Sequence, residues 1–195
     1  IMLDSMSSLK SDFPKLELPI LEVPHDWKVK KDVFIVTNGD LRLEANQTCW
    51  KIQKTYEDKL VKVLETRFEI NPIRAHDFKN NEKHGFISSQ KEGSDAFAKI
   101  DTNAPVIVLL TAWQYSHHIA PSLANHKGPV LVLANFDGTW PGLVGALNLE
   151  GSLTSLGKEY SRLWSENFDD EFFYSKLKEW FQSGSISHDL TYLTK

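Results

Sequence analysis

The chain contains few of the features that would place it directly in a functional class. Its 195 residues include a single cysteine, Cys49, which excludes an internal disulfide and fits a reducing compartment. No apolar run approaches the roughly 20 residues that span a bilayer. The N-terminal stretch also has no continuous apolar segment of the secretory type. We therefore expect a cytoplasmic protein that has no membrane partner.

The sequence also lacks the short motifs of nucleotide-binding and nucleophilic enzymes. The loop 37–42, which follows the first apolar run, offers one glycine, whereas a dinucleotide fingerprint needs three. A P-loop lysine and a G-x-S-x-G elbow are missing as well. The net charge of −4 gives no reason to expect a nucleic-acid partner. We predict no catalytic residue and no bound cofactor in this chain.

Apolar runs and amphipathic segments alternate regularly along the chain. Hydrophobic residues make up 41% and charged residues 25% of it, as in ordinary globular proteins. The apolar runs predict buried strands at 33–36, 69–74, 106–110, 130–133 and 162–166. Helical spacing predicts helices at 45–67, 90–99, 118–125, 141–150 and 169–181.

This alternation predicts the α/β fold class. We expect a doubly wound, parallel, five-stranded sheet of flavodoxin-like (Rossmann-like) order 2-1-3-4-5, in which Pro72 suits an edge strand. This domain extends over residues 32–183. Residues 1–31 are expected to form an extended arm, because three prolines interrupt any helix there. Residues 184–195 are expected to begin a linker or a next domain.

In this strand order the first and third strands are neighbours whose crossovers leave on opposite faces. Ligands of such sheets bind in the crevice beyond the carboxyl ends of these strands. The loops 37–42, 111–118 and 135–142 therefore meet along one edge, which we call the carboxyl rim. The sequence predicts a binding site there.

The first two rim loops supply candidate ligand contacts. Arg42 can present its guanidinium fork to a carboxylate, a phosphate or a sugar hydroxyl; the alternative is an ion pair with Asp40 or Glu44. Trp113 can stack on the apolar face of a sugar ring, and Gln114 can bind hydroxyls. The alternative for Trp113 is a side chain that closes the end of the sheet.

Histidines and small polar residues complete the predicted substrate contacts. The third rim loop contributes Asn135, Asp137 and Thr139. We expect His117 to hydrogen-bond a ligand and His118 to help start a helix. Adjacent histidines point in different directions and rarely hold one ion, so we predict no metal site in the chain.

Three other reactive side chains favour interpretations without catalysis. His76 and Asp77 follow an edge strand in a charged loop, which is typical of a solvated surface. Cys49 lies on the apolar face of a predicted helix, which favours a core position over a nucleophile.

At the rim loops the chain resembles the first, N-terminal domain of the L-fucose/L-arabinose isomerase family. The stretch 135–142, Asn-Phe-Asp-Gly-Thr-Trp-Pro-Gly, is similar to a family turn of the form F-N-G-T-x-x-P-G. The stretch 113–116, Trp-Gln-Tyr-Ser, stands where the family has a tryptophan loop, and Arg42 follows the first strand. The stretch 163–167, Leu-Trp-Ser-Glu-Asn, also fits. The resemblance covers roughly residues 32–183.

The resemblance implies a role in carbohydrate metabolism. Enzymes of this family interconvert an aldose and a ketose: a divalent metal, usually Mn²⁺, holds two neighbouring sugar oxygens while carboxylates move protons through an enediol. The metal ligands come from later domains, so Mn²⁺ is expected in the complete enzyme and not on this chain. The first domain supplies sugar contacts, often to a neighbouring subunit, with Trp113 stacking on the substrate and Arg42 and Gln114 binding it.

We therefore expect this chain to be the substrate-binding domain of a sugar isomerase, inactive by itself. Its partners would be a monosaccharide or polyol and the remaining isomerase domains or neighbouring subunits, in a homo-oligomer. The alternative is a stand-alone flavodoxin-like module that binds a small molecule or a partner protein without catalysis.

Overall fold

A computed structural model describes residues 29, 31–112 and 117–188. Strands and helices alternate along these residues: β1 (Asp32–Val36), α1 (Leu43–Phe68), β2 (Asn71–Arg74), α2 (Gln90–Phe97), β3 (Val106–Leu110), α3 (Ala120–Asn125), β4 (Val130–Asn135), α4 (Gly142–Ser155), β5 (Ser161–Ser165) and α5 (Glu171–Ser183). Most of the expected N-terminal arm and residues 189–195 lie outside the described residues.

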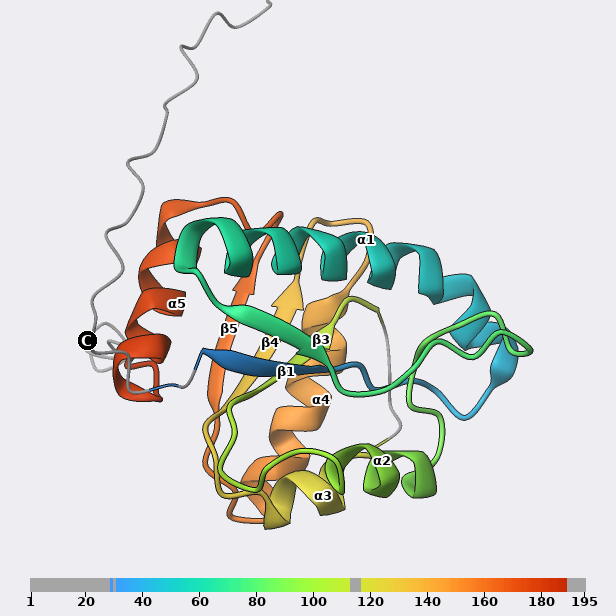
Figure 1. The fold of residues 1–195 in the computed structure, drawn as a ribbon. Coiled ribbons are helices and arrows are strands. Elements are labelled where there is room, and N and C mark those ends of the chain that lie inside the picture. Colours follow the sequence, from blue (N-terminus) through green and yellow to red (C-terminus); the bar gives the residue numbers. More distant parts are fainter. Residues whose placement is uncertain (1–28, 30, 113–116, 189–195) are drawn as a thin grey trace, which may run out of the picture.

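The five strands form one all-parallel sheet in the order β2-β1-β3-β4-β5. The prediction of a flavodoxin-like order is therefore confirmed. Pro72 lies in β2 at an edge of the sheet, where a residue without a backbone N–H is tolerated. Every crossover between parallel neighbours contains a helix, as the connection requires (Figure 1).

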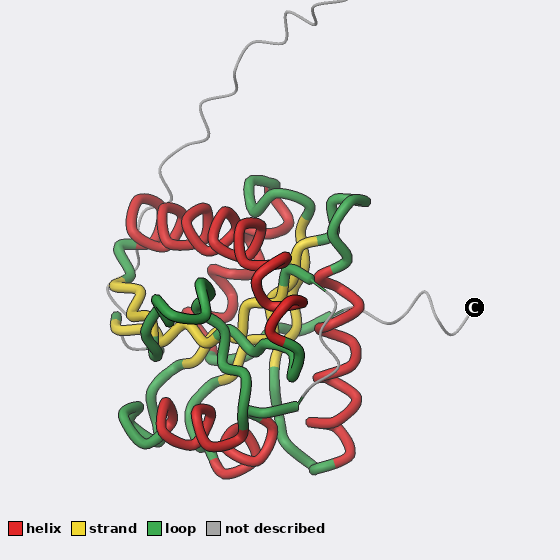
Figure 2. The backbone as a smooth tube through the Cα atoms, turned by 90° about the vertical axis from the view of Figure 1, so that its right-hand side faces the viewer, coloured by secondary structure: helices red, strands yellow, loops and turns green. Residues whose placement is uncertain are grey.

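Helices cover both faces of the sheet. Figure 1 shows α1 and α5 on one face and α2, α3 and α4 on the other, and in Figure 2 the strands lie between these helices. The chain passes from β1 to α1 on the first face and from β3 to α3 on the second. Neighbouring β1 and β3 thus mark the switch point of a doubly wound sheet.

The central strand β3 shows how one strand supplies two cores. All five of its residues are buried, and they alternate between faces. Ile107 and Leu109 pack with Leu60 of α1 and Trp180 of α5. The remaining residues of β3 pack with α2, α3 and α4 on the opposite side. This double burial explains why the strand reads as a continuous apolar run.

The buried face of helix α1 includes the apolar Tyr56, Leu60 and Leu64, and it also includes polar residues that apolar spacing does not indicate. Gln53 and Glu57 are buried, whereas Ile52 and Val63 are only partly buried. The Gln53 amide donates to the Leu109 carbonyl at 3.2 Å and accepts from the Thr111 hydroxyl at 2.7 Å. Gln53 can be buried on this helix because its side-chain amide has partners at the end of β3.

Helix α5 is capped at both ends, and helix α4 is longer than predicted. Asp170 caps α5 by accepting from the Phe173 N–H at 2.8 Å, and Gly184 ends it with a φ of 78°. Helix α4 continues past the predicted end at residue 150 to Ser155, because Leu153 on its extra turn is fully buried.

The loop between β2 and α2 is more ordered than its polar sequence indicates. Phe86 and Ile87 are buried. Ile87 exchanges backbone hydrogen bonds with the loop after β1: its N–H donates to Thr37 O at 3.0 Å, and the Gly39 N–H donates to Ile87 O at 2.7 Å. This pairing extends the sheet edge beneath the first rim loop.

Within the described part of the chain, none of the helices has the length and apolar character needed to cross a bilayer.

Candidate functional site

The first rim loop holds an arginine in place against a buried carboxylate. The Arg42 N–H and Nε donate to Asp40 Oδ1 at 2.9 and 2.8 Å, and Nη2 donates to Oδ2 at 3.2 Å. The side chain of Asn46, a residue that is 1% exposed, bonds to both backbone groups of Asp40: its Oδ1 accepts from the Asp40 N–H, and its Nδ2 donates to the Asp40 carbonyl. The bond from Arg42 is the largest of the influences that lower the pKa of Asp40. The guanidinium thus stands 75% exposed at the start of α1 with several N–H donors still available.

The third rim loop is organised by one carboxylate. Asp137 Oδ1 accepts from the backbone N–H of Thr139 at 2.8 Å and of Trp140 at 2.9 Å, which closes a tight turn. Its other oxygen accepts from the Tyr56 hydroxyl of α1 at 2.6 Å. Burial by itself would raise the pKa of Asp137, but these bonds outweigh it and lower the pKa. The carboxylate is therefore ionised at neutral pH.

A cavity of about 660 Å³ lies between these two loops. Its walls come from the start of α1 and from the loop after β4: Arg42, Ala45, Cys49, Phe136, Gly138, Thr139, Trp140 and Pro141. Small-molecule sites occupy roughly 300–1,000 Å³, so the cavity has the size of a small-molecule site. It lies at the carboxyl ends of β1 and β4, next to the switch point where such sheets bind ligands.

The start of α4 packs closely against the ends of β3 and β4 behind this cavity. A Cβ added to Gly142 would lie 2.3 Å from Asn135 Oδ1 and 2.4 Å from the Leu110 carbonyl. The helix can therefore meet the ends of β3 and β4 this closely only with glycine at this position. The buried Asn135 also donates to the Trp140 carbonyl at 3.2 Å, which supports the indole-bearing turn from beneath.

The predicted substrate contacts fall into three groups. Arg42 and Thr139 line the cavity, whereas Asn135 and Asp137 lie behind its lining and hold the loop that forms it. His117 lies elsewhere, in the groove described next. Trp113 and Gln114 lie outside the described residues.

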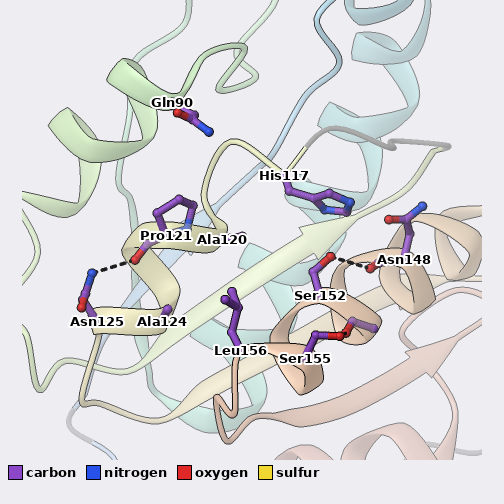
Figure 3. Close-up of a pocket in the computed structure, with 11 residues that line it drawn as sticks. Gln90, His117, Ala120, Pro121, Ala124, Asn125, Asn148, Ser152, Ser155 and Leu156 are labelled. Carbon is purple, nitrogen blue, oxygen red and sulfur yellow. Dashed lines mark hydrogen bonds between the residues drawn. The ribbon is translucent and has the colours of Figure 1, made fainter.

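A second groove of about 670 Å³ runs between α3 and α4. Figure 3 shows His117 pointing across it toward Asn148 of α4, with Ala124 and Ser152 farther along. Its hydroxyl and amide groups are largely turned back on their own helices: Ser152 donates to the Asn148 carbonyl, and Asn125 donates to the Pro121 carbonyl. His117 therefore lines a different cavity from Arg42 and Thr139.

Two of the sequence interpretations were wrong. Cys49 is not a core residue: it is half-buried in the cavity wall, and burial raises the pKa of its thiol. The spacing of residues 42, 45 and 49, one helical face, was the signal that could have placed it there. Phe136, 51% exposed, is a further wall residue that sequence reasoning missed.

His76 is the second correction, since it is not on a solvated surface. Its Nε2 accepts from the Thr37 N–H at 3.0 Å, and burial, then the nearby Arg74 and Lys79, lowers its pKa to about 3. His76 is therefore a neutral structural acceptor and does not serve as an acid at neutral pH.

Among the described residues, no group of three or more His, Cys, Asp or Glu side chains is arranged to hold a metal ion. The sequence matches no family model, and no curated protein is significantly similar to it.

Proposed function

We propose that this chain is the substrate-binding domain of an aldose–ketose isomerase, and that it contributes sugar contacts to an active site completed by other domains or subunits. The cavity at the carboxyl ends of β1 and β4 is the observation that carries the proposal. It combines aromatic walls with a hydroxyl and a guanidinium, which is the mixture that a sugar requires.

The chemistry of the walls matches the two kinds of surface on a monosaccharide. Trp140 and Phe136 offer aromatic surface to the C–H groups of the sugar. Thr139 can donate to and accept from its hydroxyls. Arg42 keeps its Nε and Nη2 on Asp40 and has further N–H groups to donate. These groups bind and orient a sugar, and none of them is placed to move a proton from carbon.

Exposed apolar side chains around the cavity support a partner that completes it. Leu41 is 76% exposed, and Leu43 and Phe136 are about half exposed. A cluster of large apolar side chains on a rim is typical of a surface that another domain or subunit covers. In the proposal that partner would bring the Mn²⁺ site, which would supply the Lewis acid for the sugar oxygens. The chain described here holds the sugar.

The single cysteine provides a direct test. Cys49 lines the cavity, so a bound sugar should shield its thiol from a maleimide reagent. We expect L-arabinose, L-fucose or their polyols to slow labelling of the 195-residue chain in a saturable way. Trp140→Ala should weaken this protection, whereas Trp164→Ala, on the exposed side of β5, should leave it unchanged.

Two results would contradict the proposal. Absence of protection by every one of these sugars and polyols would remove the sugar site. Aldose–ketose turnover by the chain alone with Mn²⁺ would show that no other domain completes the active site. The same labelling with Trp113→Ala tests the stacking role that the family resemblance implies for that residue.

A further inference from the structure

The Tyr56 hydroxyl connects three separate segments of the chain at one point. It lies on α1 and donates to Asp137 Oδ2 in the loop after β4, at 2.6 Å, and to the Glu166 carbonyl after β5, at 3.0 Å. The hydroxyl has one proton, so the two acceptors share it. The shorter bond, to an ionised carboxylate, is the stronger one.

The Tyr56 ring is itself held in place. The residue is 2% exposed, and its ring packs edge-on against Phe168 with centroids 5.3 Å apart. The Lys59 ammonium lies 4.5 Å from the ring centroid and donates to Asn167 at 3.1 Å. A fixed ring on a long, packed helix gives the hydroxyl a defined position, which a residue on a loop would not have.

Asp137 connects the Tyr56 hydroxyl to the cavity wall. One oxygen receives the Tyr56 hydroxyl, and the other receives the N–H groups of Thr139 and Trp140, both of which line the cavity. The other hydrogen bonds of the loop lie at its two ends, where the Phe136 N–H donates to the Ser165 carbonyl at 3.1 Å and the Asn135 amide donates to the Trp140 carbonyl at 3.2 Å. Phe136, Gly138 and Thr139 between these ends are exposed. Without the bond to α1, the carboxylate and its turn could move together.

We propose that Tyr56 is a positioning residue of the sugar site, which fixes the wall formed by residues 137–140 through its hydrogen bond to Asp137. This inference rests on the proposed function for the identity of the ligand. The role of Tyr56 in holding the wall does not depend on which ligand binds. It also assigns Asp137 a role in organising the wall, because its two oxygens already accept from three donors.

Tyr56→Phe is the decisive variant, because it keeps the ring and removes only the hydroxyl. Amide hydrogen exchange followed by NMR should show the Thr139 and Trp140 N–H groups exchanging about tenfold faster. Protection of Cys49 should need about tenfold more L-fucitol or L-arabinitol, a change of about 1.4 kcal/mol in binding free energy. Tyr160→Phe is the matched control: it removes a hydroxyl bonded to Thr154 and to the Glu150 carbonyl, away from the cavity.

A double-variant cycle separates positioning from general destabilisation. Asp137→Ala should weaken polyol binding by itself, and adding Tyr56→Phe to it should cost nothing more, because the carboxylate through which Tyr56 acts is already absent. Additive losses would overturn the inference. So would a Tyr56→Phe variant whose amide exchange matches that of wild type or of Tyr160→Phe. If the wild-type chain binds none of the sugars and polyols, the proposed function fails, while the exchange of the two amides still decides whether Tyr56 fixes the wall.

Discussion

Arg74 of β2 and Glu57 of α1 form an ion pair on the inner side of the helix. Nε of Arg74 donates to Oε1 of Glu57 at 2.8 Å, and the glutamate side chain is only 6% exposed. Nη2 of the same arginine donates to the Thr37 hydroxyl at 3.1 Å and to the Gly85 carbonyl at 2.6 Å. One side chain thus joins α1, β2 and the loops that follow β1 and β2.

Arg74→Met should therefore be strongly destabilising. The substitution keeps an apolar stem but leaves a buried carboxylate without its partner, which typically costs about 3–5 kcal/mol. Urea unfolding followed by circular dichroism measures this loss. Lys54→Met breaks the exposed Lys54–Asp58 pair on the outer side of the same helix and should cost below about 0.5 kcal/mol. Equal losses in the two variants would contradict the bracing role of Arg74.

Two of the three glycines of α4, Gly142 and Gly151, should respond in opposite directions to alanine. Gly142→Ala places a Cβ 2.3 Å from Asn135 Oδ1, and such overpacking costs about 1–3 kcal/mol. Gly151→Ala meets nothing within 4 Å and should stabilise the helix by about 0.5–1 kcal/mol. Thermal unfolding of both variants tests the pair. A Gly142→Ala variant as stable as wild type would show that α4 can withdraw from the strand ends at little cost.

Glu150 should make the stability depend on pH. It lies on α4 and is 4% exposed, and burial raises its pKa to about 7 although Arg162 opposes the shift. A carboxyl group with a raised pKa in the folded state favours folding below its unfolded pKa of 4.5, and this contribution is lost as pH rises toward 7. The loss is on the order of 3 kcal/mol.

Glu150→Gln removes this dependence. The difference in unfolding free energy between the variant and wild type should therefore grow in favour of the variant from pH 4.5 to 7. Taking the difference cancels the contribution of His76, whose lowered pKa acts in the opposite direction over part of this range. Glu159→Gln, at an exposed neighbouring position, serves as control. A constant difference across the range would show that the pKa of Glu150 is not raised in the folded protein.

Arg42→Lys tests the first wall of the candidate site. Lysine keeps the charge but loses the planar fork that holds Asp40 and still has N–H groups for a ligand. We expect the concentration of L-fucitol that protects Cys49 to rise about tenfold, the factor that one strong hydrogen bond contributes. Arg162→Lys, also paired with a carboxylate but outside the cavity, should leave protection unchanged. Unaltered protection in Arg42→Lys would remove this residue from the site.

The cavity itself could be predicted only in outline. Parallel strand order places the loops after β1 and β4 at one edge, which is why Arg42 and Thr139 were found from the sequence. The wall formed by Cys49 and Phe136 was not predicted, because their apolar character is equally compatible with a core. The hydrogen bond from Tyr56 to Asp137 was not predicted either, because it joins residues that are 81 positions apart in the sequence.

The sequence by itself determined the fold class, the strand order and the edge of the sheet where the candidate site lies. These features depend on local periodicity and on the handedness of parallel crossovers, both of which can be read along the chain. Only the tertiary structure decided which polar side chains are buried and what they hold. Gln53 and Glu57 resemble surface residues in the sequence, yet both are buried, and His76 is half-buried. A distant backbone or side-chain group pairs with each of the three. Pairing between groups that are remote in sequence depends on three-dimensional packing, so it cannot be predicted from local composition.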